Sequence, residues 1–206
     1  MLSAAREKRD TVSYRVIAWD FDGTLVDSLD GALAIYNELA REYGFVPIDD
    51  PAPVRELTIP EFLQVHRIPL AKVPIVYTRF LRAQKSRMPQ VRVHAGVREV
   101  LLNMRQRDYR LEANAVEDWF THVLGYSRLF GKESAIRRVV KAERIDPGEV
   151  LYVGDEVRDI AAARKAGVDV VSVTWGFNSE ETLLQHDPDY VVRSPAEFLP
   201  LLDQWR

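Results

Sequence analysis

Short apolar runs alternate along the chain with longer segments in which apolar residues recur at every third or fourth position. The runs are rich in valine and isoleucine, which is typical of strands covered on both faces of a parallel sheet. They occur at Val16–Trp19, Val150–Val153, Val168–Thr174 and Tyr190–Val192. The helical spacing appears at 28–43, 97–107, 134–142, 180–185 and in a final segment through Leu201. This alternation predicts an α/β fold, a doubly wound parallel sheet with helices on its faces.

The stretch between the first apolar run and the helix at 97–107 contains helical patterns and no strand pattern. Helices are expected at 62–66 and 73–83, and the proline-rich residues 47–60 predict a loop with short helical turns. We therefore expect two units: an α/β core of residues 1–28 and 93–206, and a small all-helical domain of residues 29–92 inserted into it.

Two aspartates stand where the first strand ends. Asp20 and Asp22 follow Val16–Trp19, and Gly23 comes next, where glycine allows a backbone geometry that lets an anion approach the main chain. Ligands of open α/β sheets bind beyond the carboxyl ends of the strands, so these carboxylates are candidates for chemistry. The alternative is an aspartate-rich turn that merely ends a strand.

A second acidic pair follows a later strand. The run Val150–Val153 leads into Gly154–Asp159, which places Asp155 and Asp159 about one helical turn apart at a strand-to-helix corner. Carboxylates in such a place suit a hard divalent cation such as Mg²⁺. A capped helix with acids near its positive end is the alternative. Lys132 stands before the helix at 134–142, a common position for a lysine without any special role.

The segment Asp20-Phe21-Asp22-Gly23-Thr24-Leu25 resembles the first motif of the haloacid dehalogenase-like (HAD) hydrolase superfamily. Lys132 matches the third motif of that family, and Gly154–Asp159 matches the fourth, in the family's order. The resemblance covers nearly the whole chain and is nearest to the phosphoglycolate-phosphatase-like branch. It implies a Rossmann-like core with a helical cap at residues 29–92, closing over the site.

The resemblance also implies a role for each matching residue. Asp20 would be the nucleophile, and Asp22 would protonate the leaving oxygen and then deprotonate the attacking water. Lys132 would neutralise the nucleophile and, with Gly23 and Thr24, contact the phosphoryl group. Mg²⁺ would be bound by Asp155, the Asp20 carboxylate and the Asp22 backbone carbonyl. Asp159 would anchor the site or hold a metal-bound water.

Composition limits the remaining possibilities. The 206 residues carry a net charge of −3, which gives no electrostatic reason to expect a nucleic-acid partner. The absence of cysteine excludes disulfides, thiolate metal sites and a cysteine nucleophile. No apolar run approaches the length of a membrane span, so we expect a cytoplasmic protein. The expected partner is a small phosphorylated metabolite, and the oligomeric state is not indicated.

One interval departs from the pattern. The pattern of residues 108–111 predicts the start of a second parallel strand. The pattern of residues 112–120, however, predicts the end of a helix, followed by a short strand at 122–124. The family's strand ending in Ser or Thr, which orients the phosphate, is not visible. Because a parallel crossover needs about a dozen residues or more, we predict that a segment of about fifteen residues is missing between Leu111 and Glu112. A normal peptide bond there would contradict this prediction.

The leading hypothesis is a Mg²⁺-dependent phosphomonoester hydrolase that acts through an aspartyl-phosphate. A sugar phosphomutase is the second enzyme hypothesis. Such an enzyme would return the phosphoryl group to a sugar and not to water. The missing hydroxyl motif motivates a third alternative, a catalytically weak relative that binds a phosphorylated ligand or a protein partner.

Overall fold

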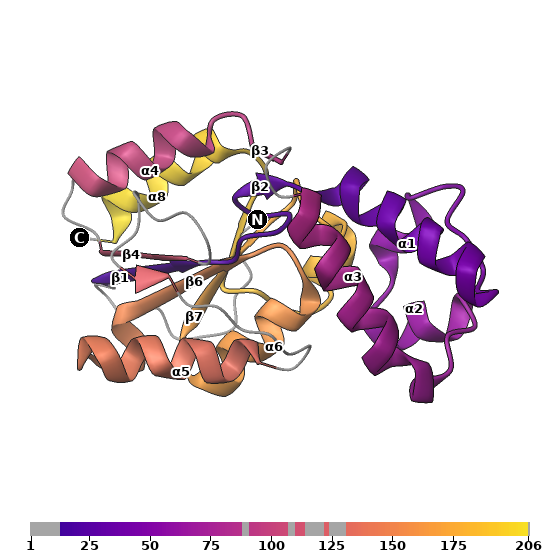
Figure 1. The fold of residues 1–206 in the computed structure, drawn as a ribbon. Coiled ribbons are helices and arrows are strands. Elements are labelled where there is room, and N and C mark those ends of the chain that lie inside the picture. The colour runs from indigo at the N-terminus through magenta and orange to yellow at the C-terminus, as the bar shows by residue number, and fades with distance from the viewer. Residues whose placement is uncertain (1–12, 88–90, 107–109, 114–121, 124–130, 206) are drawn as a thin grey trace.

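A parallel sheet forms the centre of the structure, a computed structural model that describes residues 13–87, 91–106, 110–113, 122–123 and 131–205 (Figure 1). Within these residues the sheet has six strands in the order β5-β4-β1-β6-β7-β8, and every neighbouring pair is parallel. The strands are β1 (Val16–Trp19), β4 (Arg110–Ala113), β5 (His122–Val123), β6 (Val150–Gly154), β7 (Asp169–Val173) and β8 (Tyr190–Val192).

Helices cover both faces of this sheet. In Figure 1, α4 and α8 lie on one face and α5 and α6 on the other. The helices of the core are α4 (Val97–Gln106), α5 (Lys132–Glu143), α6 (Val157–Ala166), α7 (Glu180–Leu184) and α8 (Phe198–Gln204). Side chains alternate along β1, so Ile17 packs in the cluster with α4 and α8, whereas Val16 packs with α5 and α6. The predicted doubly wound α/β fold is confirmed.

The chain between β2 and β3 is helical and has its own hydrophobic cluster. Its elements are α1 (Leu29–Tyr43), the 3₁₀ turn η1 (Pro53–Glu56), α2 (Ile59–Val65), the 3₁₀ turn η2 (Leu70–Lys72) and α3 (Val73–Arg87). Ile35 and Leu39 of α1 pack in this cluster with Ile68 and with Val76 of α3. Gly44 ends α1 in the left-handed conformation, with φ of 73°, as a glycine at this position permits.

The helical segment leaves and rejoins the sheet at one place. Strand β2 (Val26–Asp27) pairs antiparallel with β3 (Arg92–Val93), so the two connections lie side by side. This arrangement is what an inserted unit requires. The division into a core of 1–28 and 93–206 and an insert of 29–92 remains a prediction.

The predicted break between Leu111 and Glu112 is wrong. β4 runs without interruption from Arg110 to Ala113, and these two residues pair in consecutive register with Ile17 and Ala18 of β1. Residues 112–113 therefore continue the strand and do not belong to a helix. The reason is tertiary: pairing with the central strand β1 decides the conformation here, and the local residue pattern does not. Residues 114–121 and Leu124 lie outside the described residues.

Other predicted elements agree closely with the structure. The predicted helix over 28–43 begins one residue later because Ser28 is its N-cap residue. The predicted helix over 134–142 begins earlier, so Lys132 lies in the first turn of α5. No helix in the described part of the chain is both long enough and apolar enough to span a bilayer.

Candidate active site

Asp20 follows β1 directly and is almost fully buried. Its backbone N–H donates to the carbonyl of Val153 in β6 (2.8 Å), so the ends of β1 and β6 are held together. Because parallel strands end at the same edge of a sheet, this pairing brings Asp20 next to Asp155, which follows β6. The predicted convergence of the two acidic motifs is therefore seen in the geometry.

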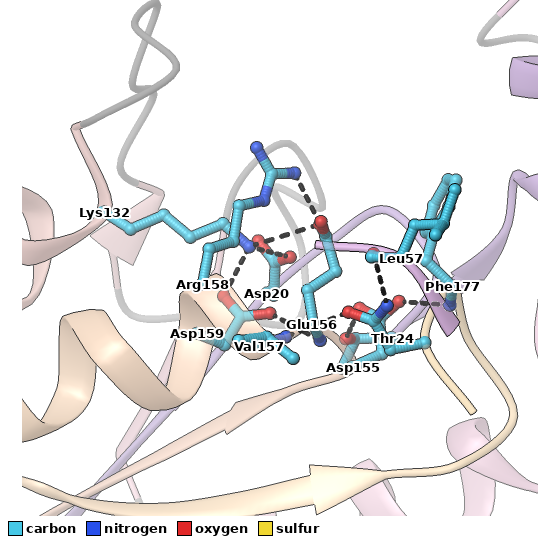
Figure 2. A network of polar contacts seen from close by, with 11 residues as sticks. Asp20, Thr24, Leu57, Lys132, Asp155, Glu156, Val157, Arg158, Asp159 and Phe177 are labelled. Carbon is cyan, nitrogen blue, oxygen red and sulfur yellow. Dashed lines mark hydrogen bonds and ion pairs between the residues drawn. The ribbon is translucent and has the colours of Figure 1, made fainter. Parts of the chain in front are cut away.

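Lys132 connects the two motifs. Its Nζ donates to Oδ2 of Asp20 (2.7 Å) and to Oδ1 of Asp159, and it lies 3.7 Å from Oε1 of Glu156 (Figure 2). The lysine side chain is only 4% exposed, so these contacts form away from bulk water. A buried cation of this kind is retained only where carboxylates compensate its charge.

Asp155 is held by one side chain and one backbone group. Oγ1 of Thr24 donates to Oδ1 (2.6 Å), and the backbone N–H of Phe177 donates to Oδ2 (2.7 Å). A Cβ at either Gly23 or Gly176 would overlap with this carboxylate, so both glycines allow its close approach. Burial and the charges of neighbouring acids raise the pKa of Asp155 well above its usual value.

Asp159 lies in the first turn of α6 and is fully buried. Oδ2 accepts a hydrogen bond from the backbone N–H of Glu156 (3.0 Å), and Oδ1 accepts from Lys132. A Cβ at Gly154 would overlap with the Asp159 carboxyl group. Burial raises the pKa of Asp159 to about 7, while Lys132 opposes the shift. Asp159 thus anchors both Lys132 and the start of α6.

The carboxylates of Asp20, Asp155 and Asp159 form one buried group, with one oxygen from each lying within 4.8 Å of the others. Hard oxygen donors and a surplus of negative charge fit a divalent cation such as Mg²⁺. The raised pKa of Asp155 supports this fit, because its charged form lacks compensation from the protein alone. The side chain of Asp22 is not part of this group.

Asp22 occupies a different environment, half-buried beyond the end of β1. Its Oδ1 atom is buried without a hydrogen-bond partner in the described part of the chain. Burial and the charge of Asp20 raise the pKa of Asp22, and the nearby Ser28 and Gln84 side chains oppose the shift. A raised pKa favours the protonated form that a general acid needs.

Gly23 and Thr24 were predicted to contact the phosphoryl group. Gly23 has a φ of 77°, in the left-handed region, and its position against Asp155 excludes a side chain. The hydroxyl of Thr24 is fully buried and is used in the hydrogen bond to Asp155. The structure therefore places Thr24 as a partner of Asp155, while a contact with substrate stays a prediction.

The sequence interpretation assigned no role to several residues that lie at this site. Glu156 and Arg158 fall inside the predicted fourth motif, so their position was a usable signal. Tyr77 and Gln84 belong to α3, and they share one face of it because they are seven residues apart. Nothing in the pattern indicated that this face of α3 would point to Asp22 and Lys132, whose charges affect Tyr77.

Comparison with known proteins agrees with this geometry. A family model described as haloacid dehalogenase-like hydrolase matches residues 17–173. A phosphoglycolate phosphatase from Synechococcus elongatus is 30% identical over 207 residues, covering 92% of this chain and 98% of the relative. A phosphoglycolate phosphatase from Vibrio vulnificus is 25% identical over 223 residues, covering 91% and 96%. These relatives match the branch predicted from the motifs.

Solved structures show the same fold. A predicted phosphatase from Clostridium acetobutylicum superposes with a TM-score of 0.78 at 20% identity, covering 93% of this chain and 99% of that chain. A putative phosphoglycolate phosphatase from Lactobacillus delbrueckii superposes with a TM-score of 0.75 at 17% identity, covering 93% and 99%. At such low identity these likenesses establish the architecture alone.

Proposed function

We propose that this chain, a phosphatase that belongs to the haloacid dehalogenase-like hydrolase family, hydrolyses a small phosphomonoester through an aspartyl-phosphate in a Mg²⁺-dependent reaction. The observation that carries the proposal is the 2.7 Å contact between Lys132 and Asp20, with Asp22 two residues further on. The names of the relatives suggest 2-phosphoglycolate as the first substrate to test.

In the first half of the reaction, a carboxylate oxygen of Asp20 attacks phosphorus, and the bond from phosphorus to the ester oxygen breaks. Asp22 gives its proton to the leaving oxygen, so the product leaves as an alcohol. The raised pKa of Asp22 favours the protonated form that this step requires. Lys132 stabilises the negative charge on Asp20 and on the phosphoryl oxygens.

In the second half, water attacks the phosphorus of the aspartyl-phosphate. Asp22, now ionised, accepts a proton from the water, and the bond to Asp20 breaks to release phosphate and the free carboxylate. Asp20, Asp155 and the backbone carbonyl of Asp22 would hold Mg²⁺, with Asp159 as an anchor. When bound, the ion would supply positive charge for the phosphoryl oxygens.

The helical segment has a role in this proposal. We assign residues 29–92 as a cap that covers the site and excludes water, with the pairing of β2 and β3 as its attachment. Tyr77 and Gln84 of α3 would be its contributions to the site. A cytoplasmic location, where small phosphorylated metabolites are available, remains part of the proposal.

The test is phosphate release from 2-phosphoglycolate and a panel of other esters with Mg²⁺. Asp20→Asn is expected to abolish release and to prevent the wild-type complex with beryllofluoride, a phosphoryl mimic. Asp30→Asn, at an exposed position in α1, is the matched control and should behave like the wild type. Turnover that survives in Asp20→Asn would refute the nucleophile assignment, provided that circular dichroism shows a folded variant.

A catalytically weak or binding relative is the second candidate, and one observation favours it. No Ser or Thr occurs between Arg110 and Phe120, so β4 delivers no hydroxyl at its carboxyl end. Such a protein would show a thermal shift with phosphate esters but no phosphate release. A phosphomutase would differ again, because it would yield an isomerised sugar phosphate and no free phosphate.

A further inference from the structure

Arg158 lies at the site but takes no part in the reaction described above. It belongs to the first turn of α6, and one terminal nitrogen, Nη2, donates to Oε1 of Glu156 (2.5 Å). Glu156 in turn lies 3.7 Å from Lys132, which contacts Asp20. The guanidinium is therefore connected to the nucleophile through Glu156 and Lys132.

Most of the hydrogen-bonding capacity of Arg158 is unused among the residues that the structure describes. Its Nε is buried and has no hydrogen-bond partner in the described part of the chain. Figure 2 shows the second terminal nitrogen turned away from Glu156. The side chain of Arg158 is 34% exposed, so part of it is open to solvent, unlike that of Lys132 at 4%. A guanidinium has five N–H donors, and Glu156 uses only one nitrogen.

The helical segment faces the same point. Tyr77 of α3 is half-buried, and the charges of Arg158, Lys132, Glu156 and Asp22 all act on its phenol. Burial raises the pKa of Tyr77, so its hydroxyl keeps its proton and can donate a hydrogen bond. Tyr77 of α3 and Arg158 of the core are therefore close enough for their charges to interact.

We propose that Arg158, held by Glu156, binds a carboxylate of the substrate, which makes the preferred substrates short phosphorylated carboxylic acids. The planar guanidinium matches a carboxylate through paired hydrogen bonds. Because only Glu156 and Lys132 stand between Arg158 and Asp20 in this chain of contacts, the arrangement suits a substrate in which a few bonds separate the carboxylate from phosphorus. This inference rests on the proposed phosphatase function.

The kinetic test compares 2-phosphoglycolate with 2-hydroxyethyl phosphate, in which a hydroxymethyl group replaces the carboxylate. Arg158→Ala should reduce kcat/KM for 2-phosphoglycolate about 10- to 100-fold more than for 2-hydroxyethyl phosphate, because a hydrogen bond to a charged group contributes about that factor. Arg158→Lys keeps the charge but loses the planar fork, so its selectivity for 2-phosphoglycolate should lie between that of the wild type and that of Arg158→Ala. Arg138→Ala, at an exposed position in α5, is the matched control with no change in selectivity.

Equal losses on both esters would overturn the inference, since Arg158 would then serve only to position Glu156 and Lys132. No loss on either ester would overturn it as well. Failure of the proposed function is recognised separately, because the wild type would then hydrolyse neither ester. In that case, calorimetry with 3-phosphonopropionate and 3-hydroxypropylphosphonate decides the matter. The inference is supported if the wild type binds 3-phosphonopropionate more tightly than 3-hydroxypropylphosphonate and Arg158→Ala loses this preference. It is overturned if the wild type shows no such preference or if Arg158→Ala keeps it.

Discussion

Lys132 is the residue on which the electrostatic balance of the site depends. It contacts Asp20 and Asp159, and burial excludes water that could compensate these carboxylates in its place. Removing one partner of a buried ion pair leaves the other charges uncompensated, which costs more than the pair itself contributes. A divalent cation bound to the same carboxylates would offset part of that loss.

Lys132→Met keeps the length of the side chain but removes its charge. Without Mg²⁺ we expect the free energy of unfolding to fall by about 3–5 kcal/mol, measured by urea denaturation. Saturating Mg²⁺ should raise the melting temperature of the variant more than that of the wild type. An equal rise in both proteins would show that the cation does not bind beside Lys132. Lys141→Met, on the surface of the same helix, is the control.

Tyr14 provides a test of pH dependence away from the site. Its hydroxyl donates to Oδ2 of Asp169 (2.6 Å), and the ring is buried in the core. Burial, together with this hydrogen bond, raises the pKa of Tyr14 above its ordinary value of 10.0. The unfolded chain therefore loses this proton at lower pH than the folded protein does.

The consequence is a loss of stability in alkaline solution. Below pH 10 Tyr14 is protonated in both states, so wild type should exceed Tyr14→Phe by about 1 kcal/mol in free energy of unfolding. Above pH 10 the unfolded state binds fewer protons, so this advantage should shrink by up to about 1.4 kcal/mol per pH unit. Urea denaturation of both proteins from pH 8 to 11 measures this difference in free energy of unfolding. A difference that stays constant with pH would contradict the raised pKa of Tyr14.

At the scale of elements, the turns after β6 and β7 position the Asp155 carboxylate. Gly176 follows β7, and a side chain there would overlap with Asp155, whereas nothing lies within 4 Å of a Cβ at Gly31 in α1. The two glycines therefore form a matched pair. Gly176 is needed for the close approach of the Asp155 carboxylate, whereas Gly31 is a helical glycine exposed to solvent.

Gly176→Ala should displace Asp155 and raise the Mg²⁺ concentration needed for half-maximal activity by at least about tenfold, since small displacements of catalytic groups have effects of this size. Gly31→Ala should leave that concentration unchanged and stabilise the protein by up to about 1 kcal/mol, because alanine is the better helix former. Magnesium titrations of phosphate release, with thermal unfolding of both variants, give the comparison. An unchanged Mg²⁺ requirement in Gly176→Ala would refute the proposed role of Asp155.

The sequence predicted those parts of the site that depend on local pattern. Apolar runs located β1 and β6 and placed Asp20 and Asp155 each at a strand end, and the resemblance to the HAD family implied that the two carboxylates share one site. The roles of Thr24 and Phe177 could not be predicted in this way. Their contacts with Asp155 depend on how closely separate loops approach, which no spacing in the sequence encodes.

At the scale of the whole molecule, β4 shows where the local pattern is insufficient. Leu111 and Glu112 were interpreted as the two sides of a break, yet both pair with β1 in one strand. The sheet needs a strand between β1 and β5, and β4 occupies that place. Local propensity is a weak guide for a strand at such a position, since its neighbours decide its conformation.

The helical segment also bears on the organisation of the whole molecule. The two hydrophobic clusters on the faces of the sheet contain no residue of 29–87, and the third cluster consists of residues from this segment alone. Hydrogen bonds join the two parts. For example, Ser179 and Thr182 donate to Glu56 of η1 (2.5 and 2.6 Å). Each part therefore has its own core, which supports the proposed division.

Replacing residues 29–90 with a short glycine–serine linker tests this division directly. Because Asp27 and Arg92 are paired residues of β2 and β3, a linker of about four residues suffices to join them. The shortened protein should unfold in one cooperative transition in urea, since both clusters of the sheet remain complete. Hydrolysis of 2-phosphoglycolate should fall by at least about 100-fold, because Tyr77 and the exclusion of water are lost.

The control is a variant in which the same linker is inserted after Asp27 and the helical segment is retained. It shows whether a disturbance of the β2–β3 pair alone has these effects. A shortened protein that fails to fold, beside a folded insertion control, would show that the sheet depends on the helical segment and that the proposed boundaries are wrong.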